Sequence, residues 1–308
     1  MASFYIGVDV GGTTIKMGIF SDIGELLEKW EIPTRTEEEG KNILPDIVDS
    51  IEEKRAVYGG NILGIGMGIP GPMTDDGVVL KCANFGWGVF NVKNAVADLT
   101  GVGNVKVGND ANVAALGEMW KGGGCGYDSI VMVTLGTGCG GGIIYHGKVL
   151  TGSKGAGGEI GHIKVEANET ETCGCGNKGC LEQYVSAVGI VRMAKKNLRE
   201  DSCLNQCEEI TAKDVFDGAR EGDAYCLEIV ERFGKYLGTA LSDVAHVVDP
   251  EAFVIGGGVS AAGQILIDVV EKYYRENAMY ALKDTRFHLA KLGNDAGIYG
   301  AVRMVLFK

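Results

Sequence analysis

The chain has 308 residues, 45% of them hydrophobic and 23% charged, so it can bury a large core and falls outside the disordered and fibrous classes. Its formal net charge of −12 disfavours a nucleic-acid partner, because non-specific binding depends on Lys and Arg meeting phosphates. No apolar run of about 18 residues and no basic-then-apolar leader occurs, so we expect no membrane partner and a cytoplasmic protein. The 49 glycines indicate tight turns and backbone that approaches ligands closely.

The first predicted element is a β-hairpin. An apolar run at 4–10 is followed by a glycine turn, and residues 14–20 alternate as a strand does. Asp9 ends the first strand, and the N–H groups of Gly11 and Gly12 could cradle an anion. Asp9 and Lys16 could then meet Mg²⁺ and a phosphate, although such a stretch taken alone is more often just a turn.

Two more glycine turns follow predicted strands. Residues 131–144 again run strand, Thr/Gly turn, strand, with Thr134 in the place of Asp9. Gly256, Gly257 and Gly258 follow the buried strand 253–255 and precede a helix that begins near residue 261. Three such turns indicate a nucleotide held between two related halves of the chain.

Asn109 and Asp110 occupy a position typical of ligand-binding residues. Between the first two turns we expect helices at 42–58, 91–99 and 111–120 and strands at 62–69 and 105–107. The two polar residues therefore stand at the carboxyl end of a strand and the start of a helix, where α/β proteins place ligands. The alternative for Asp110 is a simple helix N-cap.

Residues 155–184 concentrate metal-binding side chains. His162, Cys173, Cys175 and Cys180, with glycines between the thiols, complete a tetrahedral Cys₃His set that leaves no position for water or substrate. We therefore expect a structural Zn²⁺ that takes no part in chemistry; a disulfide, idle thiols or an iron–sulfur cluster are the alternatives. The six other cysteines are expected to pack as small hydrophobes, and the odd total of nine favours a reducing compartment.

The rest of the chain is predicted to be scaffold. Helices are expected at 185–199, 212–220, 224–248, 264–278 and 296–306, with a strand at 286–292. The segment 224–248 carries apolar residues every three or four positions, which predicts a helix with one buried face.

Six motifs occur in order along the chain: IGVDVGGTTIKMGIF, GNDANVAALGE, VTLGTGCGGGII, GGEIGH, CGCGNKGCLEQ and VIGGGVS. This ordered set resembles the ROK sugar kinases, and within that family it looks most like the ATP-dependent glucokinases. The resemblance spans nearly the whole chain. It implies the actin-like ATPase (ribonuclease H-like) fold, in which two α/β domains flank a central cleft. The small domain would comprise 1–108 and a returning helix at 294–308, and the large domain, with the zinc knuckle, 109–293.

The same resemblance implies phosphorylation of glucose at its 6-hydroxyl by ATP, with Asp110 as general base. A carboxylate near the attacking hydroxyl is also what the chemistry requires. The residues implied for the sugar are Asn84, Asn109, Asp110, Glu159, His162 and Glu182. Those implied for ATP and Mg²⁺ are Asp9, Gly11, Gly12, Thr13, Lys16, Thr134, Gly136, Thr137 and Gly138, with Gly256, Gly257 and Gly258 on the adenosine side.

Other functions stay open within the resemblance. The hexose could be fructose, N-acetylmannosamine, N-acetylglucosamine or allose, and the donor could be polyphosphate. Sugar-sensing repressors of the family carry a helix-turn-helix before the kinase-like domain, for which a first strand at residue 4 leaves no room. A chaperone-type ATPase would not need GGEIGH or the cysteine knuckle. A homodimer is expected, and zinc is expected to order a sugar-binding wall around His162.

Overall fold

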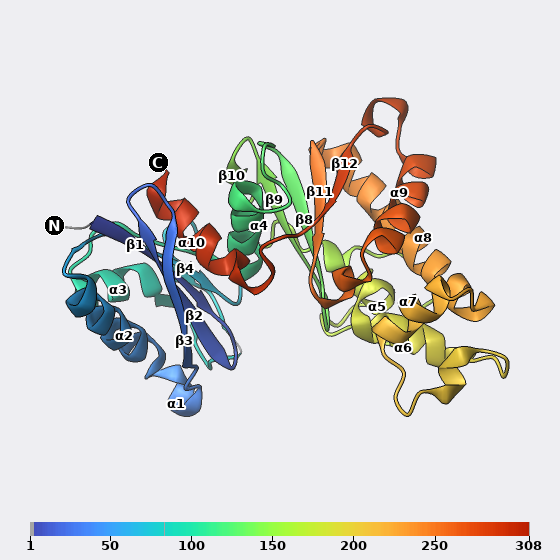
Figure 1. Cartoon of the computed structure of the whole chain (residues 1–308), viewed down its shortest axis with the longest axis horizontal. Helices are drawn as coiled ribbons and strands as arrows, with labels where there is room; N and C mark the ends of the chain where they lie inside the picture. Colours follow the sequence, from blue (N-terminus) through green and yellow to red (C-terminus); the bar gives the residue numbers. More distant parts are fainter. Residues whose placement is uncertain (1–2, 83, 308) are drawn as a thin grey trace. The chain divides into compact units, whose positions relative to one another are not determined.

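The computed structural model describes residues 3–82 and 84–307 and divides into two compact units (Figure 1). Unit 1 comprises Met1–Gly126, Gly142–Gly158 and Leu292–Lys308, and unit 2 comprises Tyr127–Gly141 and Glu159–Lys291. Each unit contains strands of a five-stranded sheet and helices packed on it, which confirms the predicted α/β class. Within the described part of the chain, no helix has the length and apolar character needed to span a membrane.

The sheet of unit 1 has the strand order β3-β2-β1-β4-β7. Its strands are β1 (Ser3–Val10), β2 (Thr14–Ser21), β3 (Leu26–Pro33), β4 (Asn61–Ile69) and β7 (Val105–Asn109). The predicted hairpin is confirmed, because β1 and β2 pair antiparallel, while β1, β4 and β7 run parallel. Sequence reasoning missed β3, whose side chains are nowhere fully buried, as expected of an edge strand that carries charged residues.

Helices cover both faces of this sheet. They are α1 (Glu37–Gly40), α2 (Ile43–Tyr58), α3 (Val92–Thr100), α4 (Asp110–Lys121) and α10 (Ala296–Leu306), beside a small pair of strands, β5 (Val78–Val79) and β6 (Phe90–Asn91). The apolar sides of α2 and α3 share one core with β1, β2 and β4. Helix α10 packs on the opposite face with Phe20, beside α4, as Figure 1 shows for these two distant segments.

Glycines allow α10 to lie directly against the strands and against α4. A Cβ at Gly66 would stand 1.8 Å from the carbonyl oxygen of Ala301, and one at Gly300 would stand 1.7 Å from that of Val113. Real Cβ atoms cannot approach so closely, so larger residues would push these backbones apart. The abundant glycines therefore serve close packing as well as the turns predicted from the sequence.

A second sheet repeats the strand order of the first, as β10-β9-β8-β11-β12. Its strands are β8 (Ile130–Leu135), β9 (Cys139–Tyr145), β10 (Lys148–Val149), β11 (Ala252–Gly256) and β12 (Arg286–Leu289). Strand β11 pairs parallel with both β8 and β12, as β4 does with β1 and β7. The predicted repeat of strand, glycine turn and strand thus extends to the whole sheet.

The helices of unit 2 follow the predicted pattern with two differences. They are α5 (Glu182–Val185), α6 (Ala187–Lys196), α7 (Ala212–Arg220), α8 (Ala224–Val248) and α9 (Gln264–Asn277). The single helix predicted at 185–199 is wrong, because Ser186 is extended and caps α6 by accepting the Gly189 N–H at 3.0 Å. The helix predicted at 264–278 is confirmed as Gln264–Asn277, while the start expected near residue 261 is instead part of a 3₁₀ turn over Gly258–Ala262.

The observed division differs from the predicted domains in the placement of α4 and of Gly142–Gly158, both of which belong to unit 1. A boundary at residue 108 assigns α4 to the second domain, whereas contacts place it in unit 1. The reason is that α4 packs along α10, which returns to the first sheet as expected.

Candidate functional site

Asp110 begins α4 at the carboxyl end of β7, but it does not cap the helix. The cap is Asn109, whose Oδ1 accepts the N–H of Asn112 at 3.2 Å. The Asp110 carboxylate accepts the Ala111 N–H at 2.8 Å and the Asn109 Nδ2–H at 3.0 Å. Burial raises the pKa of Asp110, and these hydrogen bonds oppose part of the rise. Asp110 is therefore a partly buried carboxylate whose position helix capping does not explain.

Asp9 is the last residue but one of β1 and the second carboxylate at this edge of the sheet. The pKa of Asp9 is raised to about 6: burial raises it most, Lys16, its cross-strand partner on β2, lowers it, and the charge of Asp110 raises it. The first turn of α10 abuts Asp9, since a Cβ on Gly297 would lie 2.4 Å from its Cγ. The carboxyl ends of parallel strands thus bring Asp9 and Asp110 into electrostatic contact.

The turn after β1 is built differently from the predicted phosphate cradle. The N–H of Gly11 donates to the carbonyl of Thr14 at 3.1 Å, and the Thr34 hydroxyl donates to the carbonyl of Gly11 at 2.8 Å. The N–H of Gly11 is thus already used within the hairpin. Gly12 and Thr13 are exposed at the tip and stay predicted phosphate contacts.

The turn after β8 is linked to Glu182. Here the N–H of Gly136 donates to the carbonyl of Gly138 at 3.0 Å, and the N–H of Cys139 donates to Glu182 Oε2 at 3.1 Å. The other oxygen of Glu182, Oε1, accepts the Cys173 thiol at 3.5 Å. The residue predicted for the sugar therefore joins the glycine turn to the cysteine knuckle, a connection that no sequence pattern signalled.

A cavity of about 490 Å³ in unit 2 brings two of the predicted glycine turns together. Gly136 and Thr137 from the turn after β8 and Gly258 from the turn after β11 all line it. Helix α7, predicted to be scaffold, forms another wall and presents Lys213, Phe216 and Arg220. Its amphipathic pattern indicated a buried face but not that this face borders a cavity.

The four predicted metal ligands converge in unit 2. The donor atoms of His162, Cys173, Cys175 and Cys180 all lie within 4.8 Å of one another. Cys175 and Cys180 are separated by 3.6 Å between sulfurs, and Cys173 Sγ lies 3.7 Å from His162 Nδ1. Tetrahedral Zn²⁺ has Zn–S distances of about 2.3 Å and Zn–N distances of about 2.0–2.1 Å. It therefore requires about 3.8 Å between two sulfur ligands and about 3.6 Å between a sulfur and a nitrogen ligand. The donor set thus has the size and chemistry that Zn²⁺ requires.

The Gln183 side chain and a close glycine contact hold the shape of the knuckle. Gln183 Oε1 accepts the N–H groups of Gly179 and Cys180 at 2.8 and 3.1 Å. Gly179 has φ of +78°, and a Cβ there would lie 1.8 Å from the carbonyl of Glu166, so the tight approach requires glycine. All nine cysteines are free thiols in this structure, which disfavours the alternative that the knuckle cysteines form a disulfide.

The other cysteines behave less uniformly than predicted. Cys203 and Cys226 lie 3.9 Å apart, and the N–H groups of both donate to Asp223, the N-cap of α8, at 2.7 and 2.8 Å. Cys125 is exposed, so it does not pack as a small hydrophobe. No periodic signal in the sequence separated these environments.

The remaining predicted sugar ligands are divided between the units. Asn84 lies exposed in the turn between Cys82 and Trp87 and belongs to unit 1, as Asn109 and Asp110 do. Glu159, His162 and Glu182 belong to unit 2, where exposed Glu159 precedes the 3₁₀ turn Ile160–His162. Their roles toward a sugar stay predictions.

Comparisons with known proteins agree on one family. The model of the ROK family matches residues 5–308. A glucokinase of Halalkalibacterium halodurans is 42% identical, over 96% of this chain and 93% of its own. Two crystal structures are similar along nearly the whole chain. A ROK hexokinase from Thermus thermophilus is 30% identical with a TM-score of 0.83, and the match covers 98% of this chain and 97% of that one. A ROK family glucokinase from Streptomyces griseus in complex with glucose and AMPPNP is 34% identical with a TM-score of 0.74, and the match covers 98% of this chain and 99% of that one. With the motifs and the repeated sheets, these matches show that the chain belongs to the ROK family and has its actin-like fold.

Proposed function

We propose that this chain is a glucokinase, which transfers the γ-phosphoryl group of ATP to the 6-hydroxyl of glucose. Membership of the ROK family and the name of its 42% identical relative support this activity. The observation that carries the proposal is Asp110, a partly buried carboxylate with a raised pKa at the junction of β7 and α4.

Asp110 is the general base of the proposed reaction. Both of its hydrogen bonds from Ala111 and Asn109 end on Oδ1, so Oδ2 is the oxygen left to accept the proton of the 6-hydroxyl. The raised pKa strengthens the carboxylate as a base. The bonds to Oδ1 hold its orientation, and orientation is most of what phosphoryl transfer requires from a protein.

ATP is proposed to bind the strand-end turns. Gly12, Thr13 and Lys16 of unit 1, and Thr134 with Gly136, Thr137 and Gly138 of unit 2, would meet the phosphates. Asp9 would hold Mg²⁺ through water, since this ion keeps most of its waters and prefers oxygen ligands. The 490 Å³ cavity beside Gly258 is large enough for the adenosine, with Phe216 as an aromatic wall.

Zinc is proposed to organise the sugar-binding side of unit 2. His162 Nδ1 faces Cys173 Sγ, which leaves the other ring nitrogen to donate to a sugar hydroxyl. Bound Zn²⁺ would supply a closed structural centre and no catalytic position. Glu182 contacts Cys173 directly, so the ordering of the knuckle also positions this carboxylate.

A coupled assay with initial rates tests the activity. Glucose, fructose, mannose, allose, N-acetylglucosamine and N-acetylmannosamine would each be offered with ATP, and glucose also with polyphosphate. We expect the highest kcat/KM for glucose with ATP. A clear preference for another hexose would identify a different ROK kinase, whereas DNA binding without turnover on any hexose would identify a regulator. Cytoplasmic residence and a homodimer stay predictions from the sequence.

A further inference from the structure

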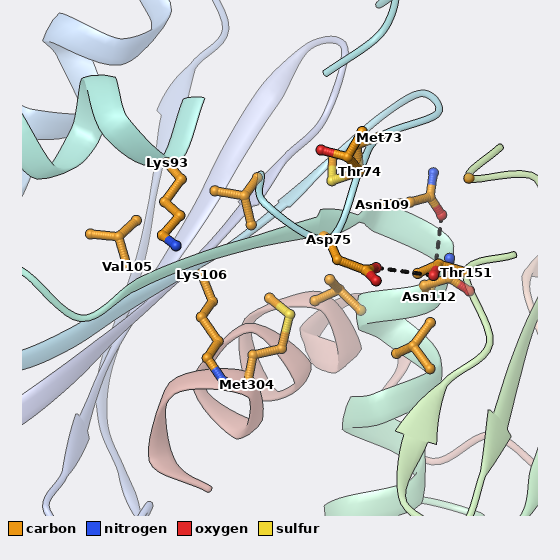
Figure 2. Close-up of a pocket in the computed structure, with 15 residues that line it drawn as sticks. Met73, Thr74, Asp75, Lys93, Val105, Lys106, Asn109, Asn112, Thr151 and Met304 are labelled. Carbon is orange, nitrogen blue, oxygen red and sulfur yellow. Dashed lines mark hydrogen bonds between the residues drawn. The ribbon is translucent and has the colours of Figure 1, made fainter. Parts of the chain in front are cut away.

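A second cavity, of about 260 Å³, lies beside the edge strand β7 and is lined by residues of unit 1 alone (Figure 2). Its walls come from the loop at 73–75, from α3, β7, the first turn of α4, the segment 149–155, and Met304 of α10. The volume corresponds to roughly nine water molecules at about 30 Å³ each, enough for one monosaccharide-sized molecule. Asn109 lines this cavity, whereas Asp9 and Asp110 do not, so it is adjacent to the proposed catalytic carboxylates without including them.

Asn112 brings an unsatisfied acceptor to one side of the cavity. Its side chain is only 5% exposed, and Oδ1 has no hydrogen-bond partner among the residues that the structure describes. The neighbouring Asn109 does not relieve this, because its Nδ2–H groups donate to the carbonyl of Gly71 and to Asp110 Oδ1. A buried acceptor without a donor is costly, and the hydroxyl of a bound molecule would supply one.

Two lysines border the opposite side. Figure 2 shows Lys93 and Lys106 across the cavity from Asn109, Asn112 and Thr151. Neither ammonium group pairs with an acidic side chain within residues 3–82 and 84–307. The one acidic side chain in the lining, Asp75, accepts the Thr151 hydroxyl at 3.0 Å, between the two sides. The cavity therefore has a cationic end and a hydrogen-bond-accepting end.

The walls of the cavity are tightly built. Thr74 accepts the N–H of Val78 on its hydroxyl at 3.2 Å, and the carbonyl of Thr74 accepts the N–H of Gly77 at 3.0 Å. A Cβ at Gly77 would lie 2.7 Å from Cβ of Lys93, so this turn also fixes the base of the Lys93 side chain. A preformed wall of this kind reduces the ordering that a ligand must impose.

We propose that this cavity binds a phosphorylated monosaccharide, with its phosphate at Lys93 and Lys106 and a sugar hydroxyl donating to Asn112 Oδ1. A free phosphate held at the lysines would leave Asn112, on the opposite side of the cavity, without a donor, and a neutral sugar would leave both lysines without a counter-charge. That the ligand is the enzyme's own product rests on the proposed function, whose product, glucose 6-phosphate, is of this class. The bound hydroxyl would then contact the same helical turn that carries Asp110.

Isothermal titration calorimetry without ATP tests the site, with glucose 6-phosphate, inorganic phosphate and glucose as separate probes. We expect glucose 6-phosphate to bind at least tenfold more tightly than phosphate or glucose. The double variant Lys93→Met, Lys106→Met should weaken its binding at least tenfold. Lys148→Met is the matched control, because Lys148 is exposed on β10 and lines no cavity described here. Asn112→Ala should weaken glucose 6-phosphate binding while leaving phosphate binding unchanged.

Several outcomes would overturn the proposal: no binding of glucose 6-phosphate by the parent protein, equal binding of phosphate alone, or unchanged binding in the double variant. Because the product could also occupy the catalytic site, the double variant is assayed for glucose phosphorylation. Unchanged kcat and KM beside lost binding assign the effect to this cavity. If the parent protein instead phosphorylates another hexose, the 6-phosphate of that hexose becomes the probe, so the two proposals fail separately.

Discussion

The two sheets share one strand order but differ in the chemistry at the ends of their first strands. In unit 1, Asp9 is the last residue but one of β1; burial is the main cause that raises its pKa to about 6, and the charge of Asp110 contributes to the rise. In unit 2, Thr134, with a neutral hydroxyl, is the last residue but one of β8, and the following turn is linked to Glu182 through the N–H of Cys139. The repeated scaffold therefore carries its charged, desolvated groups at one of its two turns.

The four predicted zinc ligands add to the contrast between the two units. Cys173, Cys175, Cys180 and His162 all belong to unit 2, where the Gln183 side chain accepts backbone N–H groups of the knuckle and Glu182 accepts the Cys173 thiol. Substitutions in unit 1 should therefore act mainly on turnover and on Mg²⁺–ATP, whereas those in unit 2 should act mainly on binding and local stability.

The largest effect is expected for Asp110→Asn. Loss of the general base should lower kcat for glucose by about 10²–10⁴-fold with little change in stability, because Asn keeps the shape of the side chain. Steady-state kinetics would measure kcat, and thermal unfolding would measure the stability. Asp98→Asn, an exposed aspartate on α3, is the control. Near-normal turnover in a folded Asp110→Asn variant would remove Asp110 from the mechanism.

Asp9→Asn should weaken the use of ATP by about 10–100-fold, the range for a lost charge-assisted contact. The same change should stabilise the folded state. Between pH 3.8 and about 6, native Asp9 holds a proton that the unfolded chain has released, so the parent protein loses stability as pH rises. Above that window Asp9→Asn should be more stable by up to about 3 kcal/mol, and near pH 3 the two should be equal.

Denaturant unfolding of both proteins between pH 3 and 8 measures this difference. The prediction would be contradicted if the difference in unfolding free energy between the two proteins grew as pH fell, or if Asp9→Asn were less stable than the parent protein at pH 7. Either result would show that Asp9 is stabilised in its ionised form. The contrast with Thr134 would then be wrong.

Removal of the metal, or Cys175→Ala, should raise KM for glucose roughly tenfold and lower the unfolding temperature, with KM for ATP unchanged. The reason is that the knuckle positions His162 and Glu182. Zinc content and both KM values would be measured together. Cys125→Ala provides the control, since that cysteine is exposed and lies outside the group. Normal glucose binding by a folded, zinc-free protein would contradict the coupling.

The smallest effect is expected for Thr134→Val. A single neutral hydrogen bond contributes about 1 kcal/mol, so KM for ATP should rise about fivefold at most, with kcat nearly unchanged. Measuring kcat and KM for ATP in Thr134→Val and Asp9→Asn under the same conditions tests the comparison of the two turns directly. If Thr134→Val reduced activity as strongly as Asp9→Asn, the two turns would be functionally equivalent despite their different charge.

The parts of the fold with strong local patterns were predictable from the sequence. The helices at 212–220, 224–248 and 296–306 were predicted with their observed bounds, and the first hairpin was also correct. These elements have regular apolar spacing, with glycine, proline or capping residues at their ends, so neighbouring residues suffice to define them. The ordered motifs identified the family for a related reason, because each combines a turn with the polar residues beside it.

Tertiary structure decided the features that join distant segments. Only the folded chain shows that Asn109 rather than Asp110 caps α4, that Glu182 connects the turn after β8 with Cys173, and that α7 borders a cavity. The cavity beside β7 likewise assembles residues from six separate segments. Hydrogen bonds and burial depend on which groups meet in space, whereas sequence periodicity records only which way each residue faces within its own element. The sequence by itself therefore determined the family, the strand-end turns and the metal ligands, and tertiary contacts decided how their charges and hydrogen bonds are satisfied.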